Sequence, residues 1–294
     1  KVTMAALIFG CVCNILLDPI LIFGLGPVPA MGIAGAALAT GIGQALSTGI
    51  YLVVYASTEL PVRLRRACLK LDKELDTRLY SIGIPAILNL ALPSLLVTFL
   101  NSLLAAFSGS YVVVLGIYYK LQTFLYLPAN GIVQGMRPLI SYNYGARKPD
   151  RVKKTIKCAM FYAEAIMLVG FLLFQFLPDK LLGLFSASEA MLAIGKPALR
   201  IICFHFLLAG MSIILSSTFQ ALGNGMFSLI ISVCRQLVVL LPAAWLLSKT
   251  GNVNMVWWAF VIAELVSVTL SFVFFARLDK KIIEPMYDNA AAAQ

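Results

Sequence analysis

The chain has 294 residues, of which 61% are hydrophobic and only 12% are charged, and its net charge is +10. Soluble domains are roughly 45–50% apolar and about 25% charged, and even large ones bury only about three quarters of their surface, so this composition excludes a water-soluble fold. The cations stand in short segments between long apolar stretches. That distribution is typical of membrane topology and excludes a nucleic-acid-binding face.

Eight apolar stretches follow one another along the chain. A bilayer core about 30 Å thick needs roughly 20 apolar residues per crossing helix. The stretches are too long for barrel strands, and lipid requires each backbone group to be paired within its own segment. The sequence therefore predicts an all-α integral membrane protein whose helices cover residues 3–25, 31–56, 80–107, 111–136, 153–177, 197–221, 226–248 and 253–277.

The basic residues predict the orientation of these helices. If Lys1 is cytoplasmic, 16 Lys and Arg residues fall on its side of the membrane and three on the other. The inner cations lie mainly at residues 63–78, 147–157 and 277–281. Because cytoplasmic loops carry the excess of positive charge, both ends of the chain are expected in the cytoplasm.

Two parts of the sequence are similar in outline. Residues 4–40 and 228–264 each hold an apolar helix with a proline near its outer end (Pro19 and Pro242), a short loop and a second helix. The motif "FQALGNG" precedes the second copy only. By this alignment the second copy ends a six-helix unit, and the first is the end of an earlier unit, so we expect four further helices before Lys1.

Several separated motifs resemble one known family. They are "YYKLQTFLYLPANG" and "GIVQGMRPLISYNYGARKPDRVKK" near the middle of the chain, "SSTFQALGNG" further on, and "LDPILIFGLG…GIAGAALAT" near the start. From about Val2 to Arg277 the chain resembles the bacterial branch of the multidrug and toxic compound extrusion (MATE) transporters. The resemblance implies twelve helices in two six-helix lobes, and export of cationic amphipathic compounds in exchange for Na⁺ or H⁺.

The resemblance also implies the domain organisation. Residues 1–57 match the last two helices of the N-terminal lobe, 58–79 a basic cytoplasmic linker, 80–278 the six-helix C-terminal lobe, and 279–294 a cytoplasmic tail. In the family an acidic residue on the very first helix is a main cation or proton site. That helix is not in this sequence, so no residue here takes over its role.

Charged residues at membrane depth call for a partner or a function, because each costs several kcal/mol near the bilayer centre. A rise of about 1.5 Å per residue places Lys120 and Glu164 near the middle of neighbouring helices. We expect Glu164 to be the counter-ion of Lys120, either as a coupled proton carrier or as a structural pair. By resemblance, Lys120, Gln122 and Tyr119 face the lobe interior. There Lys120 and Gln122 either contact substrate or exchange protons, or the lysine is held permanently by a carboxylate or by helix-end carbonyls.

Other polar residues extend this expected pathway. Arg235 and Glu264 lie at similar depth in the last hairpin and are predicted to form a structural buried ion pair. His205, the only histidine, is either a proton relay or a satisfied core residue. Four uncharged hydrogen-bonding residues are expected either to line the pathway or to hold helices together: Asn101, Asn130, Gln134 and Gln220.

Prolines and one glycine are candidate hinges. Pro85, Pro93 and Pro128 lie inside apolar stretches, where each removes a backbone hydrogen bond and favours a kink or a bending point. In "PLISYNYGA" we expect Pro138 to permit a bend and Gly145 to end the helix in the left-handed conformation, forming a cytoplasmic gate corner.

The sequence thus favours a secondary antiporter that works by alternating access in the inner (plasma) membrane. The alternative is a flippase of the same superfamily for lipids or lipid-linked oligosaccharides, which should have a more cationic cavity. An intramembrane enzyme is disfavoured because "HFLLAG" lacks the second histidine of a zinc helix. The expected partners are a cationic small molecule and the bilayer, with no nucleic acid, no metal, no cofactor beyond the coupling ion, and a monomeric state.

Overall fold

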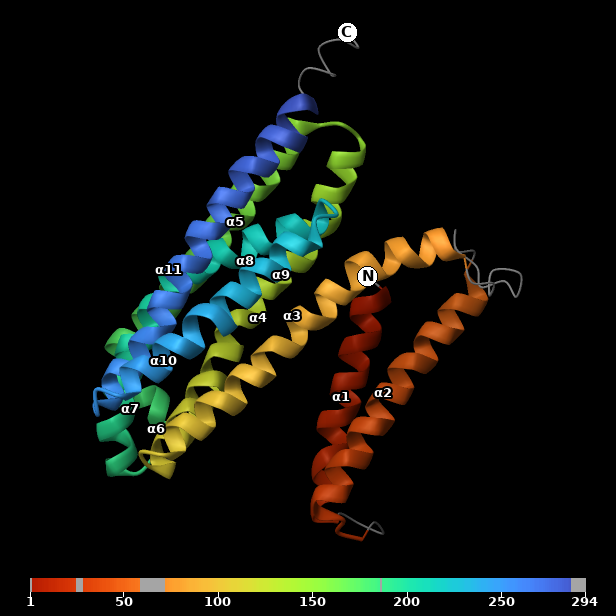
Figure 1. Cartoon of the computed structure of the whole chain (residues 1–294). Coiled ribbons are helices and arrows are strands. Elements are labelled where there is room, and N and C mark those ends of the chain that lie inside the picture. The colour runs from red at the N-terminus through yellow and green to blue at the C-terminus, as the bar shows by residue number, and fades with distance from the viewer. Residues whose placement is uncertain (1, 25–28, 59–71, 186, 287–294) are drawn as a thin grey trace. The chain divides into compact units, whose positions relative to one another are not determined.

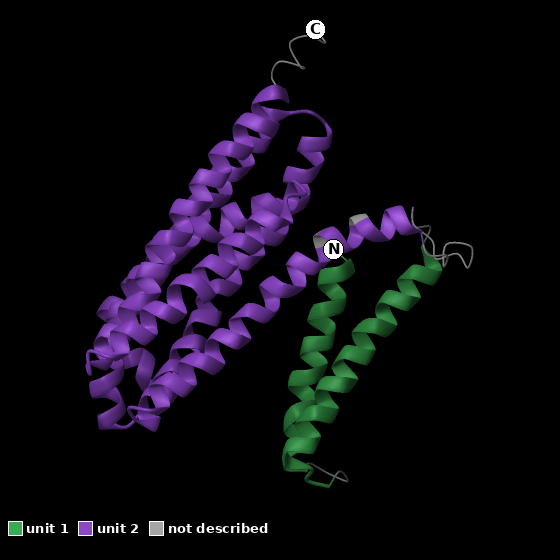
Figure 2. Cartoon of the chain, in the orientation of Figure 1, with its two compact units in different colours: residues 1–71 green, residues 72–294 purple. Residues whose placement is uncertain are grey.

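The computed structural model describes residues 2–24, 29–58, 72–185 and 187–286 (Figure 1). The chain divides into two compact units, residues 1–71 and 72–294 (Figure 2). The boundary falls inside the predicted linker 58–79. Residues 59–71, which hold most of the cations of that linker, lie outside the described residues, as do residues 287–294 of the predicted tail.

Within the described ranges, eight helical spans are long and apolar enough to cross a membrane, which confirms the predicted all-α membrane fold. Five are single helices: α1 (Val2–Phe23), α2 (Gly32–Ser57), α3 (Lys73–Ala105), α4 (Gly109–Gly145) and α5 (Pro149–Phe176). The other three spans, Glu189–Ala221, Gly225–Ser248 and Val253–Met286, are built from several helical segments each.

Unit 1 is a hairpin of α1 and α2 in which small residues bring the two backbones together. Gly10 on α1 and Gly43 on α2 are both buried. A Cβ atom on Gly43 would lie 2.8 Å from the carbonyl oxygen of Gly10, and one on Gly10 would lie 2.7 Å from that of Gly43. Glycine at both positions therefore permits this close approach, the usual way in which helices associate in lipid.

Unit 2 contains three interruptions of α-helical geometry. A 3₁₀ turn, η2 (Cys203–His205), separates α7 (Glu189–Ile202) from α8 (Phe206–Ala221). A π-helical segment, η3 (Cys234–Leu240), separates α9 (Gly225–Val233) from α10 (Leu241–Ser248), and another, η4 (Asp279–Ile283), follows α11 (Val253–Leu278). Such 3₁₀ and π-helical interruptions are frequent at functional sites. A further short helix, α6 (Pro178–Gly183), was not predicted.

The π-helical segment η3 has a local cause in the sequence. Leu241 donates its N–H to Gln236 O, five residues back rather than four. Pro242, the next residue, has no N–H to donate, so the ladder cannot continue normally at this point.

The core of unit 2 consists of two apolar clusters and a set of buried polar side chains. In Figure 1, α5, α8 and α11 run side by side, and α5 packs on both α4 and α8 while α3 packs on α9. Tyr118, Phe206 and Trp257 are fully buried in one apolar cluster, and Ile140 and Phe219 in the other. Most buried polar side chains come from α8, α9, η3 and α11, among them Ser212, Ser217, Ser228, Gln236, Glu264 and Ser267.

Helix α3 begins at Lys73, earlier than the predicted residue 80. The carboxylate of Asp72 accepts hydrogen bonds from the backbone N–H groups of Glu74 (3.0 Å) and Leu75 (3.3 Å). Glu74 and Asp76 then place negative charge in the first turn, where it interacts favourably with the helix dipole and stabilises the start of α3. The last residues of the predicted linker are therefore helical.

The predicted left-handed end of α4 at Gly145 is wrong. Pro138 lies inside a helix that continues to Gly145, and the residue with left-handed backbone is Arg147, at φ 52°. Lys148 N–H donates to Asn143 O (2.9 Å) and Arg147 N–H to Tyr144 O (3.0 Å). This pair of bonds is a Schellman motif, so α4 ends two residues later than the glycine suggests and α5 starts directly after it.

Candidate functional site

A cavity of about 270 Å³ lies inside unit 2, and we call it the aromatic cavity. Its walls come from α3, α4, η2, η3 and α11, so two of the three interruptions, η2 and η3, border it. Tyr119, Tyr126 and Phe260 contribute aromatic surface, and Arg235 and Glu264 contribute the charges. The volume is close to the lower end of the range for small-molecule sites, about 300–1,000 Å³.

The structure brings Arg235 and Glu264 together in this cavity. Arg235 Nη1 lies 3.2 Å from Glu264 Oε2, and the glutamate side chain is only 4% exposed while that of the arginine is 29% exposed. Arg235 belongs to η3 and Glu264 to α11. Removing either partner would leave a charge in a low-dielectric interior, a situation that costs several kcal/mol.

Three buried oxygen atoms bordering the aromatic cavity have no hydrogen-bond partner in the part of the chain that the structure describes. They are Tyr119 Oη, Gln236 Oε1 and Glu264 Oε1. Buried polar atoms are nearly always paired with protein or water. These oxygens are therefore positions at which water, an ion or a polar group of a ligand can bind.

His205 is held from both sides of its ring. Its Nδ1 lies 2.6 Å from Ile202 O, and since a carbonyl oxygen only accepts, Nδ1 carries the hydrogen. In the neutral ring the single lone pair of Nε2 is the acceptor, and it is shared by the hydroxyls of Tyr126 (3.3 Å) and Tyr118 (3.4 Å). Both nitrogens are satisfied, which favours the interpretation as a core residue, although His205 also borders the aromatic cavity.

A second, more polar cavity of about 180 Å³ adjoins the same arginine, and we call it the serine cavity. Ser228 Oγ is its hub: it accepts from Gln220 Nε2 (2.8 Å) and Asn89 Nδ2 (3.2 Å) and lies 2.6 Å from Ser216 Oγ. Arg235 lines both the serine and the aromatic cavities. Polar groups therefore follow one another through the interior of unit 2.

At the other side of the serine cavity lies Arg137 of α4. Its Nη2 donates to Gln220 Oε1 at 2.7 Å and approaches Ser217 Oγ at 3.4 Å. The predicted pathway residue Gln220 thus links this arginine to Ser228. Arg137 itself was not among the predicted site residues.

The predicted pairing of Lys120 with Glu164 is wrong. Lys120 is exposed, and its Nζ lies 5.9 Å from the ring centroid of Phe185, in the segment between α6 and α7. Glu164 instead packs against α8, where a Cβ on Gly210 would lie 2.5 Å from Glu164 Oε2. Equal depth on adjacent helices did not imply that the two side chains face each other.

The remaining predicted residues take different places. Gln122 and Tyr119 border the aromatic cavity with Pro93, whereas Lys120 does not. Pro85 is buried, 3.8 Å from where a Cβ on Gly225 would stand. Neither cavity is lined by Asn101, which is half-buried on α3, or by the exposed α4 residues Pro128, Asn130 and Gln134.

Sequence reasoning missed Tyr126, Gln236 and the serine cavity. A signal for the cavity was present, since serines recur four residues apart on three helices: Ser212 and Ser216, Ser228 and Ser232, Ser267 and Ser271. Residues spaced by four share one helix face. Three such hydroxyl faces in successive apolar helices indicate a common polar interior.

Comparisons with known proteins agree with this architecture. The MatE family model matches residues 85–246, more than half of the chain. The multidrug export protein MepA of Staphylococcus aureus (strain bovine RF122 / ET3-1) is 26% identical over 264 residues, 90% of this chain and 57% of that protein. MepA of Staphylococcus haemolyticus is 28% identical over 273 residues, 92% of this chain and 58% of that protein.

Solved structures show the same fold. The MATE multidrug transporter DinF-BH has a TM-score of 0.81 and 32% identity, over 94% of this chain and 61% of that one. An outward-facing multidrug resistance MATE family transporter of the MOP superfamily has a TM-score of 0.84 at 24% identity, over 97% of this chain and 63% of that one.

The chain thus spans 57% of the length of the Staphylococcus aureus MepA that it matches. The family match covers α3 to α10 almost completely, which includes most of the helices around both cavities. The chain therefore belongs to the MatE family of transporters.

Proposed function

We propose that the chain forms part of a secondary antiporter that exports cationic amphipathic compounds in exchange for Na⁺ or H⁺, and that the aromatic cavity contributes contacts to the compound. The supporting observation is the combination of aromatic faces with an incompletely paired buried carboxylate, Glu264. Aromatic faces attract cations and apolar rings alike, and a buried carboxylate oxygen adds a directed acceptor.

Arg235 has a specific part in this proposal. An antiporter needs its site to be stable when neither cargo nor coupling ion is bound. Arg235 supplies an internal cation 3.2 Å from Glu264 that balances the carboxylate in that state. A cationic compound or coupling ion then competes with Arg235 for Glu264, so its binding changes the contact between η3 and α11. Differential contacts of this kind are what bias one conformation over another.

The driving force is adequate for such exchange. One elementary charge that crosses 100 mV gains about 2.3 kcal/mol. The basic segment 147–157 supports a placement of this end of α4 and α5 at the cytoplasmic face of the plasma membrane. We propose both ends of the chain on that side and a monomeric transporter.

The flippase alternative fits the cavity less well. A lipid-linked pyrophosphate needs free cations to hold its charge. Arg235 is the cation that borders the aromatic cavity among the residues described, and it is already paired with Glu264. The aromatic cavity therefore favours a cationic cargo over an anionic headgroup.

The test is transport by the full-length protein in proteoliposomes. Ethidium flux is followed by fluorescence while a Na⁺ gradient or a pH gradient is imposed separately. Flux driven by either gradient supports antiport and identifies the coupling ion. Absence of flux under both gradients, with a lipid-linked oligosaccharide translocated instead, would overturn the proposal.

A further inference from the structure

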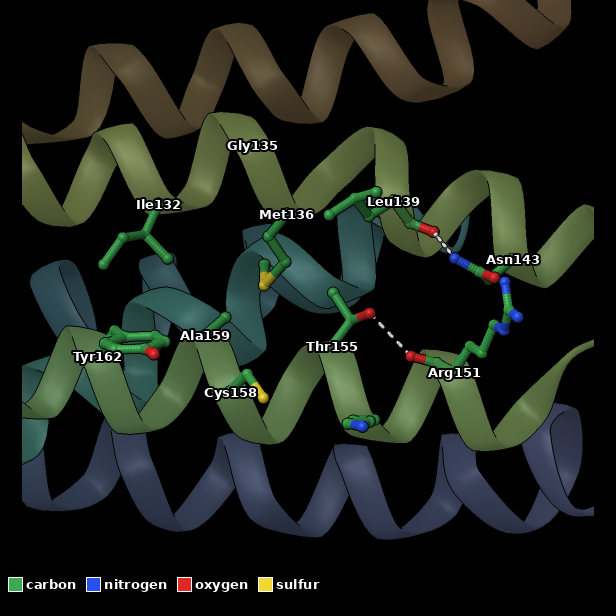
Figure 3. Close-up of a pocket in the computed structure, with 11 residues that line it drawn as sticks. Ile132, Gly135, Met136, Leu139, Asn143, Arg151, Thr155, Cys158, Ala159 and Tyr162 are labelled. Atoms are coloured by element: carbon green, nitrogen blue, oxygen red, sulfur yellow. Dashed lines mark hydrogen bonds between the residues drawn. The ribbon is translucent and has the colours of Figure 1, made fainter.

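A groove of about 460 Å³ opens between α4 and α5, away from the two cavities described above. Figure 3 shows its two rows of side chains, with Ile132 and Met136 projecting from α4 and Tyr162 and Ala159 from α5. The apolar side chains lie toward one end. We call it the basic groove because its other end carries Arg151 and Lys154.

The two cations of the groove are not used inside the protein. In the same helical turns Lys153 forms an ion pair with Asp279, at 3.0 Å, and so ties α5 to η4. Arg151 and Lys154 are exposed, and neither has an ion-pair partner within the described part of the chain. The α5 helix therefore separates a structural lysine from two cations that face the groove.

The length of the groove matches one leaflet of a bilayer. Arg151 and Tyr162 lie at its two ends and are eleven residues apart on α5, which is about 16 Å at 1.5 Å per residue. Half of a hydrocarbon core of about 30 Å is about 15 Å. A molecule that fills the groove thus has an anionic head at the helix ends and an apolar chain along the hydrocarbon.

We propose that the basic groove binds an anionic phospholipid, with its phosphate at Arg151 and Lys154 and an acyl chain against Ile132, Met136 and Tyr162. Two free cations beside an apolar floor complement this charge and shape, and they repel a cationic cargo. Guanidinium and ammonium groups are the usual donors to phosphate oxygens. The proposal does not depend on what the protein transports.

Glycine at position 135 leaves the groove open. Gly135 borders the groove, and a Cβ atom placed on it would meet nothing within 4 Å. A leucine there fills the groove without moving the backbone. Gly131, one turn earlier on α4, has equal free space but does not border the groove, so it offers a matched control.

The experiment measures lipid retention on the full-length protein. Purified protein is equilibrated with mixed micelles that contain equal amounts of phosphatidylglycerol and phosphatidylcholine, and bound lipid is counted by native mass spectrometry. The wild type is expected to retain more phosphatidylglycerol than phosphatidylcholine. The R151Q/K154Q variant should retain at least about fivefold less, while K148Q/K157Q, which removes equal charge from exposed lysines outside the groove, should match the wild type.

A second pair of variants tests the groove by filling it, without any change of charge. Gly135→Leu should lower phosphatidylglycerol retention as R151Q/K154Q does, and Gly131→Leu should not. Equal retention of the two lipids by the wild type, or equal losses in both members of each pair, would overturn the proposal. Displacement of the lipid by millimolar inorganic phosphate alone would show that the site binds free phosphate, and this would also overturn it.

Discussion

Arg235 Nη1 lies 3.2 Å from Glu264 Oε2 at the border of two cavities, one aromatic and one rich in serine. The bond joins the π-helical segment η3 to the regular helix α11, so it fixes the geometry of η3 against α11. The proposed transport chemistry depends on this contact, and breaking it by removing one partner should destabilise unit 2.

Glu264→Ala should destabilise the protein by about 3–5 kcal/mol, because it leaves Arg235 as an unpaired charge in the interior. The double variant R235M/E264L removes both charges and should recover most of this loss. Thermal melting of the purified full-length protein in detergent measures both effects. A double variant as unstable as Glu264→Ala would show that the charges do not act as a pair.

Ser228→Ala should cost about 1–3 kcal/mol, because it removes the oxygen that accepts from Gln220 and Asn89 and leaves both half-buried amides with unpaired hydrogens. Ser232→Ala, in the same cavity but without a hydrogen bond of its side chain among the described contacts, is the control and should change stability by less than about 0.5 kcal/mol. Equal losses in the two variants would contradict the hub role of Ser228.

Gly43→Leu should disrupt the α1–α2 hairpin, because its side chain must begin within 2.8 Å of the carbonyl oxygen of Gly10. Gly41→Leu meets nothing within 4 Å and should be tolerated. Limited proteolysis within the membrane extract, read by the survival of the hairpin fragment, compares the two. Equal resistance of both variants would mean that the glycine contact does not hold the hairpin together.

Lys120 and Glu164 should behave as independent residues. One lies over Phe185 and the other against α8, so they share no contact. In a double-mutant cycle of Lys120→Ala and Glu164→Ala, the changes in unfolding free energy should add within about 0.3–0.5 kcal/mol. A coupling above about 1 kcal/mol would restore the ion pair that the sequence suggested.

The difference between these two charge pairs shows what sequence can and cannot predict here. Hydropathy located all eight spans because the bilayer itself sets their length. The similar depth of Arg235 and Glu264 in the last hairpin also predicted their ion pair correctly, since each is the available counter-charge for the other. Depth alone failed for Lys120, because each residue turns the side chain by about 100° around the helix and depth carries no information on that angle.

The local interruptions were harder to predict for a related reason. The π-helical ladder from Leu241 to Gln236 depends on tertiary packing as well as on Pro242, and the helix end at Arg147 uses a residue that rarely adopts left-handed backbone. Gln236 borders the aromatic cavity from this π-helical segment, whereas Tyr126 does so from the regular helix α4. The serine spacing of four was the one sequence signal available for the second cavity.

The most direct test of the account is the equilibrium binding of ethidium to the purified full-length protein, measured by fluorescence for the wild type and for Glu264→Gln. Loss of a charge-assisted contact is worth about 1.5–3 kcal/mol, so the Kd should rise at least about tenfold. Thermal melting verifies that the variant is folded. An unchanged Kd in folded Glu264→Gln would contradict a cation contact at Glu264 in the aromatic cavity.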